Sequence, residues 1–404
     1  MESPESAMIR FVRLYALLTI SLLACVAGFC IVIDPYYVFG TLPIPGISRD
    51  KPQAAVWPHL AKTHQIMRQS GITTLLIGSS TTEIGFDPHS KSFDPGDKVY
   101  NFGIDGLELP AQLPFLREAL LYTHPKRIII ATSFIENLIA PMGDLPVAHA
   151  ASDPNLDRLH FLNSGGINPA REKAQIADLA FAALSLNALT DSLYTVLHQN
   201  DPNTPSCDSA GFNLGGLLNR WTRQDGTATL VTAKDRDKAS KFINWRKNPL
   251  LPTEVLTQLV EVARAHGAEV VMVILPVHVD LQEMLHQTGL DTYDDHWKQA
   301  IKDSLSTHHL ENNVKIWDFS GISPYTTENL PPVGDHHTHW QWFWESQHFQ
   351  KALGDIMLAR INHLPAPADF GVEKLTPGNP GLPAWELTHA QDVARIKAII
   401  AAAN

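Results

Sequence analysis

A run of twenty uncharged and mostly aliphatic residues, 14–33, constrains the fold of this chain more than any other feature of its sequence. As a helix that rises about 1.5 Å per residue, the run spans roughly 30 Å, which is the thickness of a bilayer's hydrocarbon core. Arg10 and Arg13 precede the run, and no basic residue follows it until Arg49. By the positive-inside rule, this pattern predicts a transmembrane anchor with a cytoplasmic amino terminus, and it predicts that everything after Asp34 is exported.

Two other interpretations of the apolar run are open. One is a cleaved signal peptide, although the apolar region of such peptides usually has only about 7–15 residues. The other is a lipoprotein processed at Cys25, although its mature chain would begin with a strongly apolar stretch. The length of the run favours an anchor, which would make Tyr36, Tyr37 and Phe39 an aromatic belt on the outer side of the membrane.

The composition excludes several classes of protein. The chain has 31 Lys and Arg against 42 Asp and Glu, a net charge of −11, and such a chain repels the phosphates of nucleic acids. A hydrophobic share of 44% with 18% charged residues is typical of a folded protein rather than a disordered one. Because Cys25 and Cys30 lie in the apolar run, Cys207 has no partner for an intrachain disulfide in the exported part.

Beyond the anchor, apolar strands alternate with amphipathic helices. The predicted strands are 73–77, 98–102, 127–132, 269–275 and 314–318, and the predicted helices are 54–69, 107–123, 253–266, 293–309 and 347–363. Strands that are almost continuously apolar predict a parallel sheet covered by helices on both faces, and therefore the α/β class.

The chain divides into four parts in this interpretation. They are a cytoplasmic tip with the anchor (1–33), a juxtamembrane linker and helix (34–70), the α/β domain (71–363) and a carboxyl-terminal appendage (364–404). A helical insertion over about 140–250, with one predicted helix at 169–198, interrupts the α/β domain.

Three loops that follow predicted strands carry the residues suited to chemistry, because ligands of parallel sheets bind at the carboxyl ends of the strands. The first places Ser80 directly after a strand and near a helix start. The second ends in Gly103 and Gly106, which allow a tight turn and close backbone approach. The third holds Glu345 and His348, so that the carboxylate can bind one imidazole nitrogen and aim the other outward as a base.

Taken in this order, the three loops resemble the conserved blocks of the SGNH/GDSL hydrolase family. The segment ending in Ser80 stands in place of the family's Gly-Asp-Ser block, which implies that Ser80 is the nucleophile. The segment ending in Gly106 resembles the second block, whose last glycine gives an oxyanion N–H, and Glu345 with His348 resembles the Asp-x-x-His block that supplies acid and base. The resemblance covers roughly 71–363 and implies a three-layer α/β/α, flavodoxin-like sandwich.

The chain departs from the family in two places. The third block, Gly-x-Asn-Asp, is replaced after the strand 127–132 by Ser-Phe-Ile-Glu-Asn, so its oxyanion-donating asparagine is either missing or displaced to Asn137. Losing one such donor typically costs about 10²–10³ in rate. The second departure is Glu345 in place of Asp, a side chain that is one methylene longer.

Within the family, the chain resembles the membrane-anchored, exported branch of DltD-like and alginate O-acetylation proteins, on the strength of the anchor followed by Asp-Pro-Tyr and of the segment 317–321. This resemblance implies a serine esterase or O-acyltransferase that works through an acyl-serine on acylated, mainly acetylated, surface or exopolysaccharide glycans. It implies a single-pass protein of the bacterial inner membrane with its domain in the periplasm, a membrane-bound acyltransferase as partner, and no cofactor. The alternative is a catalytically inert scaffold of the same fold in a polysaccharide modification or export complex.

Other features suggest weaker sites. The loop 335–339, Asp-His-His-Thr-His, has metal-ligand side chains, but adjacent ligands rarely converge on one ion, so we expect no metal and a loop beside the cleft. His278 and Trp344 are predicted to contact substrate, Asp318 to be structural, and the charged run 234–241 to be a solvated face. No dinucleotide fingerprint or P-loop is present in the sequence.

Overall fold

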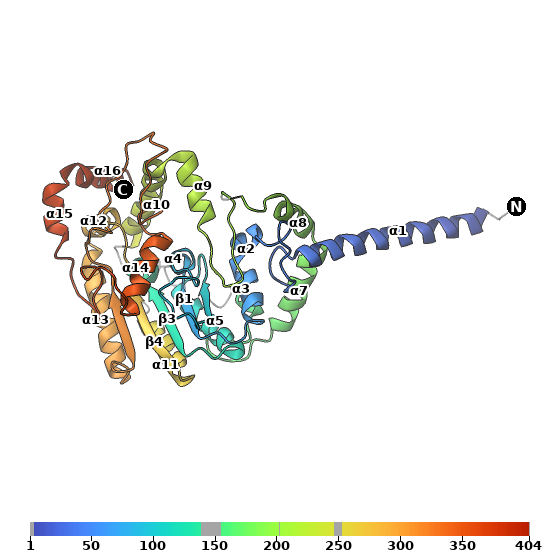
Figure 1. Ribbon diagram of the computed structural model, residues 1–404, viewed down its shortest axis with the longest axis horizontal. Helices are drawn as coiled ribbons and strands as arrows, with labels where there is room; N and C mark the ends of the chain where they lie inside the picture. The colour runs from blue at the N-terminus through green and yellow to red at the C-terminus, as the bar shows by residue number, and fades with distance from the viewer. Residues whose placement is uncertain (1–3, 139–154, 202, 246–252, 404) are drawn as a thin grey trace.

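The computed structural model describes residues 4–138, 155–201, 203–245 and 253–403, and a five-stranded parallel sheet lies at the centre of this part of the chain (Figure 1). The strands are β1 (Thr74–Gly78), β2 (Val99–Gly103), β3 (Arg127–Thr132), β4 (Glu269–Ile274) and β5 (Val314–Asp318). Their order is β2-β1-β3-β4-β5, so the direction of winding reverses beside β1, and all the carboxyl ends lie at one edge. The predicted α/β class with a parallel sheet is confirmed.

Helices account for most of the remaining described residues. They are α1 (Pro4–Ile33), α2 (Pro52–Val56), α3 (Pro58–Ile66), α4 (Ser80–Gly85), α5 (Leu109–Tyr122), α6 (Phe134–Asn137), α7 (Arg171–Leu184), α8 (Leu186–Leu197), α9 (Gly216–Asp225), α10 (Thr227–Trp245), α11 (Thr253–Ala265), α12 (Val279–Thr288), α13 (Asp291–Thr307), α14 (Lys351–Ile361), α15 (Leu382–Thr388) and α16 (Ala390–Ala403).

Successive residues of each strand enter two different hydrophobic cores. Leu75 and Met272 point into a core that includes residues of α5, α11 and α13, whereas Leu76 and Val271 point into a second core with residues of α14. Both faces of the sheet are therefore buried, which is why its strands are apolar without interruption in the sequence.

Several helices differ from those predicted. The predicted helix 54–69 is broken at Trp57, because the residue before Pro58 is pushed out of the helical region of backbone space. The predicted helix 169–198 is a pair, α7 and α8, bent by 57° at Ser185, whose hydroxyl caps the second helix. Helices α9, α10 and α12 have no counterpart among the predictions. Three parts of the chain at or within the predicted insertion, 139–154, 202 and 246–252, lie outside the described residues.

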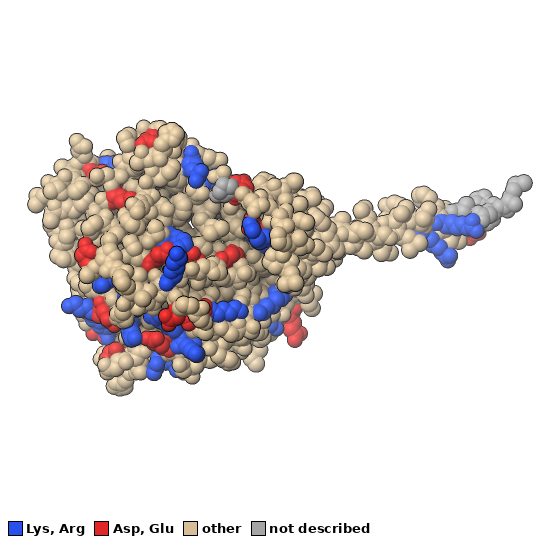
Figure 2. Space-filling view, viewed as in Figure 1, with Lys and Arg blue, Asp and Glu red and all other residues tan. Residues whose placement is uncertain are grey.

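Helix α1 is long and apolar enough to cross a membrane, as predicted. The span that meets this criterion is Met8–Ile33, which includes the predicted run 14–33. The helix projects from the domain, and charged side chains appear only near its amino-terminal end (Figures 1 and 2). Its side chains are exposed from Met8 to Cys25, and from Val26 onward they begin to pack against α7 and α8.

The segment after α1 is packed into the domain and is not a slack linker. The buried Asp34 carboxylate accepts backbone N–H groups of the following turn, one of them at 2.8 Å. The Lys51 ammonium, also buried, donates to the carbonyls of Ile33 at 2.6 Å and Asp34 at 2.9 Å. The predicted aromatic belt is wrong for Tyr36 and Tyr37, because both rings are buried inside the protein.

The described part of the carboxyl-terminal segment, 364–403, is packed into the domain and is not an appendage. Phe370 belongs to the core on the α14 face of the sheet, and Val372 pairs with Asp318 at the end of β5. Helix α16 packs on α10 and α12 and buries Ile396 in the core on the opposite face. The prolines of the segment therefore belong to an ordered connection that returns the chain to the sheet.

Candidate functional site

The first two predicted loops lie side by side at the carboxyl edge of the sheet. Strand β1 ends at Gly78, opposite Gly103 at the end of β2. A Cβ atom on Gly103 would lie 2.6 Å from the backbone nitrogen of Glu83 in α4, so only glycine allows this approach. Ser80 is the first residue of α4, directly beside this contact.

Ser80, His348 and Glu345 form one hydrogen-bonded chain. Ser80 Oγ lies 2.8 Å from His348 Nε2, and on the other side of the ring His348 Nδ1 contacts Glu345 Oε1. An ionised carboxylate only accepts hydrogen bonds, so Nδ1 carries the imidazole proton and Nε2 is left to accept from the Ser80 hydroxyl. The His348 side chain is 19% exposed, which leaves its edge open to a ligand.

The Glu345 carboxylate is buried and ionised. Burial raises its pKa, but the charge and hydrogen bond of His348 and the charge of Lys238 outweigh burial and lower the pKa to about 2. The two carboxylate oxygens also accept the backbone N–H groups of His348 at 3.0 Å and Gln347 at 3.2 Å. These bonds hold the carboxylate against the imidazole.

Glu345 and His348 lie in an irregular loop rather than at the start of a helix. Helix α14 begins only at Lys351, and before it Phe343 and Phe349 form an antiparallel bridge. The N–H of Trp344 donates to the carbonyl of His348 at 2.8 Å inside this bridge. A tight backbone loop, and not helical spacing, therefore brings the carboxylate to the imidazole.

Groups from distant parts of the chain form hydrogen bonds with the loop that holds Glu345 and His348. Ser346 Oγ donates to Asp235 of α10 at 2.7 Å, and Lys238 of the same helix donates to the Gln347 side chain. The N–H of His278 donates to the carbonyl of Ser346 at 2.8 Å. The helical insertion thus contributes directly to the site, and the prediction that 234–241 is a solvated face is wrong for the residues that face the loop.

Arg395 of α16 partly neutralises the carboxylates in this support. Its guanidinium lies 2.6 Å from Asp280 Oδ2 and 3.7 Å from Asp235 Oδ2. Burial and repulsion from Asp280 raise the pKa of Asp235 well above its usual range, and Arg395 opposes that rise. Sequence analysis did not single out this contact, because its three members are far apart in the chain.

Gly106 closes the second loop in a left-handed conformation, with φ +73°. A Cβ atom there would meet nothing within 4 Å, and no acceptor for the Gly106 N–H lies among the described residues. Its backbone is therefore open to a ligand, as a donor to an oxyanion must be.

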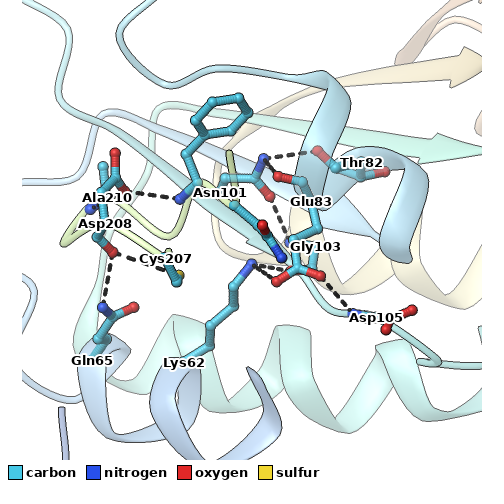
Figure 3. Close-up of polar contacts among 12 residues, drawn as sticks. Lys62, Gln65, Thr82, Glu83, Asn101, Gly103, Asp105, Cys207, Asp208 and Ala210 are labelled. Carbon is cyan, nitrogen blue, oxygen red and sulfur yellow. Dashed lines mark hydrogen bonds and ion pairs between the residues drawn. The ribbon is translucent and has the colours of Figure 1, made fainter. Parts of the chain in front are cut away.

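A buried ion pair holds the backbone of this second loop (Figure 3). Lys62 Nζ lies 3.1 Å from Glu83 Oε1 and donates to the carbonyl of Gly103, while Glu83 Oε2 accepts the N–H of Asp105 at 2.9 Å. Both charged side chains are fully buried, so each needs the other. Burial raises the pKa of Glu83, and the charge of Lys62 opposes that rise.

Asn101 ties the same loop to α4, as Figure 3 also shows. Its Nδ2 donates to the carbonyls of Thr82 at 2.8 Å and Phe86 at 2.7 Å, and its Oδ1 accepts the N–H of Gly103 at 2.8 Å. The first and second loops therefore form one hydrogen-bonded body around Ser80.

The amide of Asn137 is already engaged. It is buried, and its Nδ2 donates to Thr132 Oγ1 at 2.6 Å and to the carbonyl of Ser133 at 2.7 Å. These bonds use both amide hydrogens, so the predicted role as oxyanion donor requires the side chain to leave its partners. In the same turn, Glu136 accepts a hydrogen bond from the hydroxyl of Ser79, next to Ser80 in the chain.

The structure does not place His278 where it could bind a substrate. The residue is 1% exposed, its Nε2 lies 3.0 Å from the carbonyl of Glu328, and its ring stacks on Trp340. Burial lowers its pKa, which favours the neutral ring. Its role is support, in contrast to the predicted substrate contact. Trp344 is half-buried, with its indole against Gly215 of the insertion, and keeps an exposed edge.

Among the described residues, no group of three or more His, Cys, Asp or Glu side chains is placed to hold a metal ion. In the loop 335–339, Asp335 accepts the N–H groups of His337 at 2.8 Å and Thr338 at 3.0 Å. Hydrogen bonds from Thr338 and His337 lower the pKa of Asp335 to about 2. Local turn bonds therefore occupy this carboxylate.

A cavity of about 210 Å³ opens at the same carboxyl edge of the sheet, beside residues that follow β3, β4 and β5, and neither Ser80 nor His348 lines it. Lys298 and Ser320 are among its lining residues, and both bind Asp318, whose Oδ2 lies 3.3 Å from the Lys298 ammonium. Asp318 therefore binds Lys298 and Ser320 and not the imidazole of His348.

Comparison of the chain with protein-family models, curated proteins and solved structures found no match.

Proposed function

We propose that this protein is a membrane-anchored serine esterase or O-acyltransferase of the SGNH type, with Ser80 as nucleophile, His348 as base and Glu345 as the acid that orients the base. The observation that carries the proposal is the hydrogen-bonded chain from Ser80 Oγ through the imidazole to the buried carboxylate. The position of this chain at the carboxyl edge of a doubly wound sheet adds support.

The first half of the reaction is acylation of Ser80. His348 Nε2 takes the hydroxyl proton while Oγ attacks the acyl carbon, and the carbonyl oxygen becomes an oxyanion. The N–H groups of Ser80 and Gly106 are the donors expected to stabilise this charge. When the intermediate collapses, the ester bond breaks and His348 returns the proton to the departing alcohol.

The second half releases the acyl group. Water or a sugar hydroxyl gives its proton to His348 and attacks the acyl-serine, and Ser80 recovers its hydrogen as the ester bond breaks. Water as acceptor gives hydrolysis, and a glycan hydroxyl gives transfer. Exclusion of water from the site decides between them.

The proposed substrates are acylated, mainly acetylated, glycans at the bacterial cell surface. Support comes from the resemblance to DltD-like and alginate O-acetylation proteins and from the apolar span of α1. With Arg10 and Arg13 before that span, the domain is proposed to lie in the periplasm. A membrane-bound acyltransferase is the proposed partner if the reaction is transfer.

One observation favours a second candidate, an inert scaffold of the same fold. Both amide hydrogens of Asn137 are used inside its own turn, so a side-chain donor for the oxyanion is lacking at the third block. Two backbone N–H groups would then have to suffice for catalysis.

The test is hydrolysis of p-nitrophenyl acetate by the full chain in detergent, with intact-mass detection of an acetyl adduct. Wild type is compared with Ser80→Ala and His348→Ala. The controls are Ser209→Ala and His266→Ala, because both residues are exposed and belong to neither loop of the site.

The proposal expects a rate and an adduct that disappear with Ser80→Ala, and a rate that falls by several orders of magnitude with His348→Ala. The two control variants should match wild type. A folded wild-type protein without rate or adduct, tested with and without native membranes as a source of partner, would favour the scaffold.

A further inference from the structure

The bend between α7 and α8 lies against the carboxyl-terminal end of α1, where this helix enters the domain (Figure 1). Val26 and Phe29 of α1 belong to the same apolar cluster as Phe181 of α7 and Leu189 of α8. We call the segment 179–190 the elbow; it includes the bend of 57° between the two helices. The elbow therefore has a fixed position along the axis of α1.

The part of α1 that lies before the elbow contacts is too short to cross a bilayer. The span therefore needs the turns that contact the elbow. From Arg13 to Val26 a helix covers about 20 Å, whereas a hydrocarbon core is roughly 30 Å thick. The missing distance of about 10 Å corresponds to the turns from Val26 to Ile33. Because the elbow packs on these same turns, it lies at the depth of the outer half of the bilayer.

The side chains of the elbow suit that depth. No residue from 179 to 190 carries a charge. Leu184 is 61% exposed and Leu186 is 74% exposed, on the two sides of the bend. Leucines this exposed beside each other would form an apolar patch in water.

A second segment adds to the same surface. Thr41 Oγ1 donates to the carbonyl of Val32 in the last turn of α1 at 3.3 Å, and the next residue, Leu42, is 87% exposed. The connection cannot swing freely, because Lys51 binds the carbonyl of Ile33 at the end of α1. Two apolar segments thus surround the point at which α1 enters the domain.

We infer that the elbow and Leu42 insert into the outer leaflet of the lipid bilayer, so that the domain is embedded at its base rather than only tethered above the membrane. The occupant of this surface is lipid, because the surface is continuous with a helix whose exposed side chains already require lipid. The inference rests on the proposed membrane anchoring and not on acyl transfer.

The test measures the depth of single labelled cysteines in the full chain reconstituted into phospholipid nanodiscs. An environment-sensitive NBD label is placed on native Cys25, on Leu186→Cys and on Leu42→Cys, the last two in a Cys25→Ala background. Cys30 and Cys207 are buried, and the Cys25→Ala variant alone gives the background from them. Leu387→Cys, at a position that is 87% exposed on α15, is the matched apolar control.

The expected result is graded quenching by nitroxide lipids. Label at Cys25 is quenched most by a nitroxide deep in the acyl chain, label at residues 186 and 42 is quenched most by one near the headgroup, and label at residue 387 is quenched by neither. The emission at residues 186 and 42 shifts to the blue relative to residue 387.

The other outcomes separate the two proposals. Quenching at Cys25 without quenching at residues 186 and 42 overturns the insertion of the elbow and leaves the anchor intact. Absence of quenching at all positions overturns the anchor and the elbow together. Labels that are water-exposed in pure lipid but shielded in native membranes would assign the surface to a partner protein and would also overturn the inference.

Discussion

At the scale of single residues, Glu345 sets the chemistry of its neighbour. Its Oε1 faces His348 Nδ1, and its pKa of about 2 keeps it ionised under ordinary assay conditions. An acceptor at this position fixes Nδ1 as the protonated nitrogen and, in the proposed mechanism, leaves Nε2 to take the Ser80 proton. The carboxylate never needs to receive that proton itself.

The substitution Glu345→Gln tests this arrangement. A glutamine amide can donate to Nδ1 and so favour the tautomer that cannot accept from Ser80, so we expect kcat for p-nitrophenyl acetate to fall by up to about 10⁴-fold. Glu254→Gln, at a side chain that is 57% exposed on α11, is the control and should retain the wild-type rate. Equal rates for wild type and Glu345→Gln would contradict the assigned role.

The same variant has a predictable response to acid. The folded-state pKa of Glu345 is depressed from the usual 4.5 to about 2, so its ionised form stabilises the protein above pH 4.5, and this stabilisation is lost as the pH falls toward 2. Thermal unfolding should therefore show wild type more stable than Glu345→Gln at pH 7, with a difference that shrinks between pH 4.5 and 3. A difference that is constant across this range would argue against a depressed pKa.

The position of single residues was more predictable than their hydrogen bonds. Residues that follow parallel strands gather at one edge, and Ser80 lies there beside the loop of His348. The same rule also selects His278 and Asn137, yet the ring nitrogens of His278 and the amide hydrogens of Asn137 are occupied by other groups of the fold. A local sequence pattern does not reveal such partners, because tertiary packing supplies them.

At the scale of elements, the strands could be predicted, whereas in the insertion only the helical segment 169–198 was, and α9 and α10 were not. Two-sided burial makes each strand a continuous apolar run, which is visible without any alignment. In α10, the residues Val231, Asp235, Ala239 and Phe242 recur at helical spacing on a buried face. Because Asp235 is an acidic residue within a charged segment, it hid the helical periodicity of this face. Its partner, Arg395 of α16, lies far along the chain.

Helix α16 should matter to the site through Arg395. Replacing Arg395 with Ala leaves the buried carboxylates of Asp235 and Asp280 without a cation, which typically costs about 3–5 kcal/mol in the free energy of unfolding. The ester hydrolysis rate should fall as well, because Asp235 supports the loop of His348. Chemical denaturation and the p-nitrophenyl acetate assay measure the two effects.

A matched control separates this contact from the helix that carries it. Lys397 is exposed on α16, so Lys397→Ala should change the free energy of unfolding by no more than about 0.5 kcal/mol. Arg395→Lys should retain part of the stability, since it keeps the charge but not the two-sided reach of a guanidinium. If Arg395→Ala and Lys397→Ala behave alike, the contact does not support the site.

At the scale of the whole molecule, the charges at the ends of α1 predict its orientation. Arg10 and Arg13 precede the apolar span, and the first basic residue after it is Arg49. A reporter enzyme that is active only in the periplasm should therefore work when it is fused after Asn404. Activity of a cytoplasm-only reporter at the same position would reverse the proposed topology.

If the domain is anchored and acts as proposed, the hydrogen bonds from Lys51 to the last turn of α1 also determine how it meets its substrate. A catalytic domain joined to its anchor by a flexible linker can move through a volume above the membrane and can bind ligands well above the surface. A domain attached as rigidly as this one would instead stay at a constant height above the membrane while it diffuses in the membrane plane. Encounters between the domain and its substrate would then depend on two-dimensional diffusion and on how substrate chains reach that height. Lengthening the connection after Ile33 would therefore change which substrates the domain can reach before it changed the reaction at Ser80.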